Sequence, residues 1–251
     1  SSTQFVNQYT HDYQHLFESN MLALPVSELW ANKLKTLGCP SAKINVHRMG
    51  VDTHTFMFNP INTAITPPLN ILSVARLTEK KGLNYAIDAI HSLVQQGIDV
   101  RYTIIGTGPL FEELDTKIKS LKLSAHIILA GFQDQSAIHT ALENSDLFLL
   151  PSVVANDGDM EGIPVSLMEA MAKGVLCLST FHSGIPELIE NNISGLLVPE
   201  RDANAIANTL TALLSRNDIA QLKQHARHVI EQHFDQNTLG EELAALIHDN
   251  G

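Results

Sequence analysis

The feature that most constrains the fold is a regular alternation of short apolar runs with amphipathic segments, from about Leu69 to about His233. Most of the apolar runs are continuous, which is typical of strands that are covered on both faces in a parallel sheet. Six such strands joined by right-handed crossovers form a doubly wound α/β sheet. The expected strands are Ile71–Ala75, Val100–Ile105, Ile127–Ala130, Leu147–Leu150, Val175–Ser179 and Leu196–Val198.

The amphipathic segments between these runs carry helix boundary signals. Gly97 closes the first of them, and Gly174 suits a left-handed helix end. Pro164 suits a first helical position because it has no N–H to leave unpaired. The expected helices are Leu83–Gln96, a helix opened by Gly106–Pro109 that runs through Leu121, Ser136–Asn144, Pro164–Lys173, Pro186–Glu190, Ala203–Ser215 and Ile219–His233.

One edge of this sheet is expected to form a ligand site, because doubly wound sheets bind ligands at the carboxyl ends of their strands. The loops of unusual composition all follow a strand. They are residues 76–82, 106–109, 131–134, 152–163 and 180–184. Their common placement predicts that they meet at the same edge.

An acidic block in these loops places two carboxylates, Glu161 and Glu169, eight positions apart around a helix start. A helix start offers free backbone N–H groups and a positive dipole end to a phosphate. Glu169 lies ~7.5 Å inside the helix at ~1.5 Å per residue, which is similar to the span from a diphosphate to the ribose of a nucleotide. Glu161 is then left near a sugar. A plain amphipathic helix with two solvated glutamates is the alternative.

The first part of the chain is organised differently. Leu22–Leu24 and Ile44–Val46 are expected to be strands that flank a helix at Ser27–Leu37, which is too little for a domain. The predicted division of the chain has four parts: an incomplete N-terminal domain tail (1–58), a proline-containing interdomain linker (59–69), a Rossmann-like domain (70–232) and a C-terminal segment (233–251).

Composition excludes several classes of protein. With 44% hydrophobic and 17% charged residues, the chain is expected to be a soluble globular protein. Its net charge of −11 argues against a nucleic-acid partner or an anionic membrane surface, so any phosphate binding must be local. Cys39 and Cys177 show neither metal-ligand spacing nor a disulfide framework.

Several blocks together resemble retaining glycosyltransferases of family 4, which have the GT-B fold. The blocks run in the family's order: Ser73-Val-Ala-Arg-Leu77, Lys80-Lys-Gly82, Ile105-Gly-Thr-Gly-Pro109, Gly131-Phe132, Asp146-Leu-Phe-Leu-Leu-Pro-Ser152, Glu161 to Glu169, Ser183-Gly-Ile-Pro-Glu187 and Gly195-Leu-Leu-Val198. The wording of residues 156–164 is most similar to bacterial exopolysaccharide transferases of the colanic acid type. The resemblance covers about residues 20 to 235 and implies the donor-binding half with the tail of the acceptor domain in front.

Arg76 and Lys81 are expected to bind the diphosphate of a nucleotide sugar. Arg76 directly follows the first strand, and a guanidinium can grip phosphate oxygens in two places. Lys81, held by Gly82, adds a second positive charge, and together the two neutralise the leaving nucleoside diphosphate. Solvated loop charges are the alternative, with Lys80 the fallback for Lys81.

The loop with Gly106 and Gly108 is not a dinucleotide fingerprint, because Phe111 stands where the third glycine would be. A nicotinamide cofactor is therefore disfavoured, and no cofactor beyond the donor substrate is expected. By resemblance this loop lies beside the nucleotide, and Phe132 borders the base. Simple packing over the sheet edge is the alternative for Phe132.

The resemblance assigns the other donor contacts to the acidic block. By resemblance, Glu169 is expected to bind the ribose hydroxyls, and the backbone around Gly162, Ile163 and Val165 is expected to bind the phosphates. Glu161 receives the transferred sugar or the reacting centre and is the candidate catalytic residue.

His182 is a further candidate for ligand contact, because it precedes a helix start at a strand's carboxyl end. Packing within the loop is the alternative. GT-B enzymes generally need no metal, so the resemblance implies no metal site.

The resemblance implies a cytoplasmic, hexosyltransferase-type enzyme. It would transfer sugar from a nucleoside-diphosphate sugar to a saccharide or lipid-linked saccharide acceptor in polysaccharide biosynthesis, and it is compatible with peripheral membrane association through the missing domain. The alternatives are the nucleotide-binding half of a split or regulatory assembly and a GT-B-like sugar-nucleotide epimerase. This half alone is expected to bind nucleotide and to transfer sugar poorly. The base (UDP, GDP or ADP), the sugar and the acceptor stay open.

Overall fold

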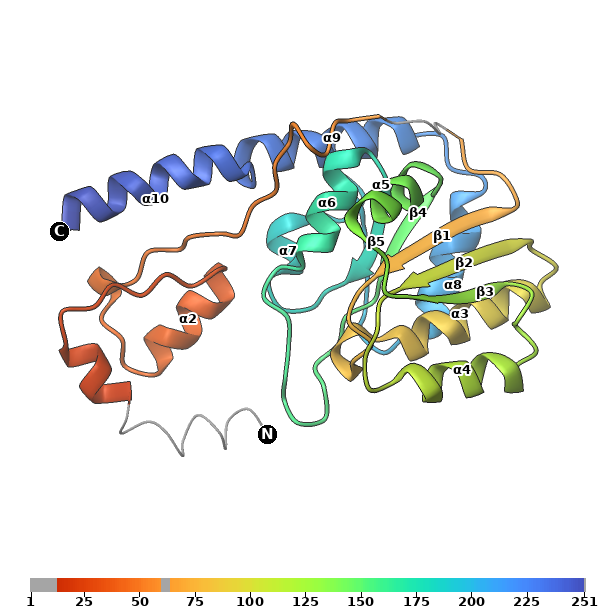
Figure 1. Cartoon of the computed structure of the whole chain (residues 1–251), viewed down its shortest axis with the longest axis horizontal. Coiled ribbons are helices and arrows are strands. Elements are labelled where there is room, and N and C mark those ends of the chain that lie inside the picture. The colour runs from red at the N-terminus through yellow and green to blue at the C-terminus, as the bar shows by residue number, and fades with distance from the viewer. Residues whose placement is uncertain (1–12, 60–63, 251) are drawn as a thin grey trace.

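A six-stranded parallel sheet with helices on both faces organises the protein (Figure 1). The computed structural model describes residues 13–59 and 64–250. The strand order is β3-β2-β1-β4-β5-β6, so the chain starts at the middle of the sheet and winds outward in both directions. The predicted doubly wound α/β fold is confirmed. The strands are β1 (Leu69–Val74), β2 (Val100–Ile105), β3 (Ile127–Gly131), β4 (Leu147–Leu150), β5 (Leu176–Thr180) and β6 (Leu196–Val198).

Two helical layers cover the sheet. One face carries α3 (Leu83–Gln95), α4 (Phe111–Ser120) and α8 (Ala203–Leu213), and the other carries α5 (Gln135–Glu143), α6 (Val165–Lys173) and α9 (Ile219–His233). Each layer buries its own apolar core. Ile87 and Leu210 are fully buried in the first, and Met168 and Ile230 are fully buried in the second. Each such side chain stabilises the fold by about 1.5–3 kcal/mol.

The predicted element boundaries in this sheet domain agree closely with the structure. β2, β4, β6 and α9 begin and end at the predicted residues. The other predicted ends differ from the observed ones by at most two residues, including those of α7 (Ile185–Leu188). Helix ends fray, so shifts of this size are expected.

The two strands predicted near the N-terminus were wrong. Only an isolated bridge joins Ala23 to Ile44, where the Ala23 amide donates to the carbonyl of Lys43 at 2.8 Å. Neither segment joins the six-stranded sheet, and a two-stranded pair on its own is marginal in water. The helix predicted between them is present as α2 (Glu28–Thr36), where the Ser27 hydroxyl accepts a hydrogen bond from the Trp30 amide.

Parts of the predicted division fall outside the described residues, namely 1–12 of the N-terminal tail, 60–63 of the linker and residue 251. At the end of the predicted linker, Leu69 is already the first residue of β1. The C-terminal segment contains a helix that was not predicted, α10 (Gln236–Asn250). The residues of α10 with described side chains are mostly exposed, so they lack the strong apolar periodicity that reveals a packed helix.

Residues 51–56 are fastened to the sheet domain by backbone and side-chain hydrogen bonds. The Val51 amide donates to the Phe234 carbonyl at 2.9 Å. The Arg227 guanidinium donates to three carbonyls, those of Phe56 at 2.7 Å, Ala172 at 2.9 Å and Thr53 at 3.2 Å. One cation therefore joins this segment to the end of α6 and to α9.

Arg227→Ala is expected to lower the free energy of unfolding by about 2–3 kcal/mol, because hydrogen bonds from a charged group are strong and their loss leaves carbonyls without partners. Urea denaturation measures the change. Arg101→Ala, at an exposed position of β2, is the matched control and should stay within about 0.5 kcal/mol of the wild type. Equal urea midpoints for the two variants would contradict the role of Arg227.

Candidate functional site

The loops that follow the strands meet at one edge of the sheet, as predicted. A short 3-10 helix, η2 (Glu79–Lys81), follows β1 and ends at Gly82, which has a φ of +63°. A Cβ built on Gly82 would lie 1.9 Å from the carbonyl oxygen of Pro151, at the end of β4. Only glycine permits both this backbone angle and this approach, so Gly82 sets the loop after β1 against the loop after β4.

The close approach of these loops brings Lys81 to Glu161. The Lys81 Nζ lies 2.9 Å from Glu161 Oε1, and the two side chains are only 14% and 9% exposed. A pair this sheltered is weakly screened by salt, and separating it without another partner for each charge is costly. Sequence reasoning selected both residues but not their contact.

The backbone of Glu161 is also held on both sides. Its amide donates to Nε2 of His182 at 3.1 Å. Its carbonyl accepts from the Ser183 hydroxyl at 2.5 Å and from the Trp30 indole N–H at 3.2 Å. Glu161 therefore has a fixed backbone, and only its side chain is free to change partner.

His182 lies behind this segment and is fully buried. Its Nδ1 lies 2.6 Å from Oε1 of Glu200, which comes just after β6. Both ring nitrogens of His182 therefore have protein partners, and the side chain packs against the loop that contains Glu161. Its predicted ligand contact would require one of these two bonds to break.

A cleft of about 460 Å³ lies next to this cluster, between the loops after β1, β2 and β3. Arg76, Gly106, Gly108 and Phe132 line it, so the structure brings these four predicted residues together. Arg76 is exposed, and the Phe132 side chain is 79% exposed at the cleft. An uncovered ring of this kind offers a face to a planar ligand.

The two glycines let the loops after β1 and β2 run in direct backbone contact. A Cβ on Gly106 would lie 1.9 Å from the Ala75 carbonyl oxygen, and one on Gly108 would lie 2.4 Å from that of Leu77. Any side chain would push the two loops apart and open the floor of the cleft.

Helix α6 begins one residue later than predicted, at Val165, with Pro164 as its N-cap. The backbone N–H groups of the first turn have no partner within the helix and point outward from its start. Gly162 and Ile163 lead into this start. Gly162 is confined, because a Cβ there would lie 2.8 Å from the Val26 side chain.

Glu169 lies one turn inside α6 and is half-buried. Burial raises the pKa of the Glu169 carboxyl above its ordinary value, because it disfavours the charged form. A carboxylate kept in such a place at a cost is a candidate for binding a polar ligand.

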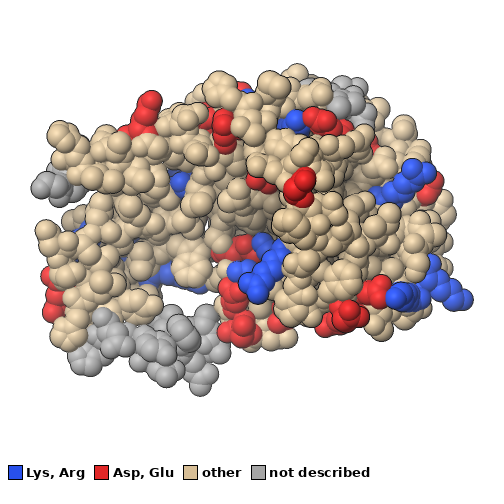
Figure 2. Space-filling model, in the orientation of Figure 1, with Lys and Arg blue, Asp and Glu red and all other residues tan. Residues whose placement is uncertain are grey.

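The N-terminal residues close one side of the site. The carboxylate of Glu187, in α7, accepts from the amides of Glu28 at 3.0 Å and Leu29 at 3.2 Å at the start of α2. Arg48 binds the same carboxylate at 3.1 Å. In the space-filling view, basic and acidic side chains lie together beside an opening between the N-terminal residues and the sheet domain (Figure 2).

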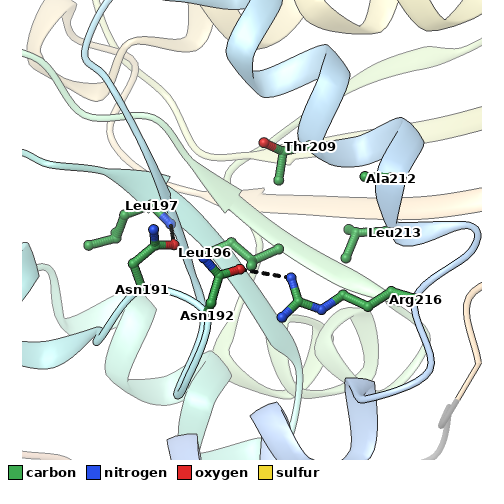
Figure 3. Close-up of a pocket in the computed structure, with 8 residues that line it drawn as sticks. All are labelled: Asn191, Asn192, Leu196, Leu197, Thr209, Ala212, Leu213 and Arg216. Atoms are coloured by element: carbon green, nitrogen blue, oxygen red, sulfur yellow. Dashed lines mark hydrogen bonds between the residues drawn. The ribbon is translucent and has the colours of Figure 1, made fainter.

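A different pocket lies between β6 and α8 (Figure 3). Arg216 there donates to Asn192 Oδ1 at 2.9 Å and binds Asp218, while Asn191 Oδ1 accepts from the Leu197 amide at 3.0 Å. Its arginine and the side-chain oxygens of both asparagines are thus already paired. Its lining, in the described part of the chain, includes none of the predicted site residues, so the cleft beside Arg76 is the candidate site.

Sequence reasoning missed Trp30, Ser183 and Glu200 as parts of the site. Glu200 had a usable signal, because it follows β6 at the same sheet edge as the other loops. Trp30 had none, since its contact joins residues 131 positions apart.

Residues 13–59 and 64–250 lack two features that would indicate other functions. They contain no cluster of three or more His, Cys, Asp or Glu side chains placed to hold a metal ion. None of their helices combines the length and the apolar character needed to cross a membrane.

Known proteins resemble this chain in sequence. It is 48% identical over 249 residues to the putative colanic acid biosynthesis glycosyltransferase WcaL of Escherichia coli. It is also 48% identical over 248 residues to the amylovoran biosynthesis glycosyltransferase AmsK of Erwinia amylovora. Each alignment covers 98% of this chain but 61% of the relative, so the chain spans about three fifths of their length.

Solved structures with the same fold have lower sequence identity. A glycosyltransferase from Rickettsia africae superimposes with a TM-score of 0.81 at 21% identity, over 97% of this chain and 67% of that one. Anabaena HepE, in complex with UDP, superimposes with a TM-score of 0.78 at 21% identity, over 91% of this chain and 64% of that one.

A family model described as "Glycosyl transferases group 1" matches residues 59–234, which contain the whole sheet and the cleft. The match extends over more than half of the chain and agrees with the sheet order and the superposed structures. The chain therefore belongs to the group 1 glycosyltransferases and has the α/β architecture of the GT-B fold.

Proposed function

We propose that this chain is the donor-binding part of a retaining glycosyltransferase. The enzyme would transfer sugar from a nucleoside-diphosphate sugar to a saccharide or lipid-linked saccharide in bacterial exopolysaccharide biosynthesis. The observation that carries the proposal is the sheltered Lys81–Glu161 pair at the carboxyl edge of the sheet, between the cleft of Arg76 and the start of α6. The names of two relatives, for colanic acid and amylovoran biosynthesis, support the class of product.

The donor would lie along the edge of the sheet from base to sugar. Phe132 and the loop of Gly106 and Gly108 would border the base, since they line the same cleft. Glu169 would accept hydrogen bonds from the ribose hydroxyls. HepE has the same fold, and its complex with UDP-glucose supports a nucleotide sugar as the ligand.

The diphosphate would lie between Arg76 and the start of α6. The amides around Gly162, Ile163 and Val165 can donate to phosphate oxygens at the positive end of the helix, whereas Pro164 has no amide hydrogen. Arg76 and Lys81 would neutralise the charge that grows on the diphosphate as the glycosidic bond breaks.

Lys81 and Glu161 give the site a built-in exchange of partners. In the structure, Lys81 Nζ binds Glu161 at 2.9 Å. A diphosphate that binds Lys81 replaces the Glu161 carboxylate as the negative partner of the ammonium group. The Glu161 carboxylate then becomes free to bind the sugar. Because its backbone is already fixed, Glu161 loses little further entropy in this step.

We propose a division of the chain that the same contacts support. Residues 1–58 would be the end of an acceptor domain, 59–69 the linker, 70–232 the nucleotide-sugar-binding domain and 233–251 a C-terminal segment. Trp30 and the start of α2, which contact Glu161 and Glu187, would bring the acceptor side to the reacting centre.

A thermal-shift panel of UDP, GDP, ADP and their sugars tests the donor site, since a ligand that binds only the folded state raises its melting temperature. Arg76→Ala is expected to weaken binding of the stabilising nucleotide about 10- to 100-fold, because a charged contact to phosphate is lost. Arg101→Ala, an exposed arginine on β2, should leave binding unchanged. The absence of a shift with every nucleotide would overturn the proposed function.

Glu169→Gln is expected to stabilise the fold at neutral pH. The pKa of Glu169 is raised in the folded state. The contribution of its protonated carboxyl to stability is therefore complete at pH values below the ordinary pKa of glutamate and is lost as the pH rises through the raised pKa. Glutamine has no charge to bury, so the urea midpoints of variant and wild type should coincide below about pH 4 and separate toward neutral pH. The same variant should bind nucleotide about tenfold more weakly, by calorimetry, because the ribose loses a charged acceptor.

Glu143→Gln is the control for this prediction. A hydrogen bond from Lys173 lowers the pKa of the Glu143 carboxyl. The ionised carboxylate therefore stabilises the fold at pH values above the ordinary pKa of glutamate, and this stabilisation is lost as the pH falls through the lowered pKa. At neutral pH, Glu143→Gln should therefore lower stability. A change in the same direction for both variants would contradict the assignment for Glu169.

The chain alone is expected to bind the donor but to transfer little sugar, because it spans about 61% of its relatives. Release of nucleoside diphosphate, measured with and without an added saccharide acceptor, checks this. Robust transfer would refute the proposed division of labour, and release of a rearranged sugar without acceptor would favour an epimerase.

A further inference from the structure

Two side chains behind Glu161, the buried His182 and the partly exposed Glu200, have no part in the proposed donor contacts. His182 is 0% exposed and lies in the loop after β5, while Glu200 is 25% exposed and follows β6. Their facing atoms, Nδ1 and Oε1, are 2.6 Å apart. A buried imidazole this close to a carboxylate has a defined proton arrangement.

The neighbouring amide decides which nitrogen of His182 carries the proton. The Glu161 N–H points at Nε2 from 3.1 Å, so Nε2 must present a lone pair. The proton is then on Nδ1, where it is donated to Glu200. His182 is therefore a neutral imidazole with a fixed tautomer.

Glu200 extends this chain of hydrogen bonds to a second point on the loop. Its other carboxylate oxygen accepts from the Val154 amide at 2.9 Å. Two amides of the loop, those of Val154 and Glu161, are thus held by one carboxylate and one imidazole. The bond to Glu161 is the one nearest the donor site.

We propose that His182, oriented by Glu200, is a positioning residue that fixes the Glu161 backbone for the sugar of the donor. The inference rests on the proposed function. Glu161 must leave Lys81 and turn to the sugar when the diphosphate binds, and its carboxylate reaches the same place each time only if its backbone stays still. Loss of the His182 bond lets the backbone move and also leaves a buried amide without a partner.

Two variants separate this role from simple anchoring of the loop. In His182→Gln, the side-chain amide reaches as far as Nε2 and keeps an acceptor for the Glu161 N–H. In His182→Asn, the shorter amide keeps a donor near Nδ1 for Glu200 but offers no acceptor to Glu161. Positioning predicts that the glutamine variant works and the asparagine variant fails, and anchoring through Glu200 predicts the reverse.

Calorimetry with UDP and UDP-glucose, and with GDP and GDP-mannose as a second pair, measures how much the sugar changes affinity. His182→Asn is expected to lower the affinity for the nucleotide sugar relative to the nucleoside diphosphate about five- to tenfold, and Glu161→Gln is expected to lower it by a similar factor. Binding of the nucleoside diphosphate alone should change less than about twofold. His182→Gln should restore the ratio to within about twofold of the wild type.

The possible outcomes distinguish a failure of the positioning role from a failure of the proposed function. An unchanged ratio in His182→Asn, together with a changed one in Glu161→Gln, overturns the positioning role and leaves the proposed function standing. An unchanged ratio in Glu161→Gln, or no binding by the wild type, overturns the proposed function itself. Should His182→Asn fail to fold, long-range ¹H–¹⁵N spectra of the wild-type imidazole decide the matter: a proton on Nδ1 supports the inference, and one on Nε2 overturns it.

Discussion

The parallel direction of the six strands is the constraint on which the rest of the structure depends. Parallel strands place every strand-to-helix loop at the same edge, and the strand order puts the loops after β1 and β4 side by side. Gly82 then allows the first loop to lie against Pro151 without a side chain between them. The Lys81–Glu161 pair follows from this approach of two loops, whereas the cleft lies between the loop after β1 and the loops after β2 and β3.

Electrostatics at this edge has to work within an acidic protein. The chain has a net charge of −11, so an anionic ligand needs a local concentration of positive groups. Arg76, Lys81 and the start of α6 provide it. In the structure, the Glu161 carboxylate pairs with the Lys81 ammonium group. This pairing offsets part of the free energy needed to hold the ammonium group largely away from water.

The N-terminal residues contribute more to the site than their length suggests. Glu187 binds the first amides of α2, and the Trp30 indole reaches the Glu161 carbonyl. Movement of these residues relative to the sheet domain would therefore reach the candidate catalytic segment directly. On its other side, the His182–Glu200 pair holds the same segment from within the sheet domain.

Local patterns in the sequence determined the doubly wound sheet, its strands and nearly all of its helices, because apolar periodicity reflects which faces are buried. They also selected Arg76, Lys81, Glu161 and Glu169, since each belongs to a loop or helix start at a strand's carboxyl end. They failed at Leu22–Leu24 and Ile44–Val46, which do not join the six-stranded sheet, and at α10, whose described side chains are mostly exposed.

Only the tertiary structure decided which side chains meet. Lys81 and Glu161 are eighty positions apart, and their pairing depends on the packing of two loops. The bond between His182 and Glu200 likewise depends on the neighbouring ends of β5 and β6. Sequence periodicity reports burial along one element, whereas these contacts arise from the distance between elements, which the packed sheet sets.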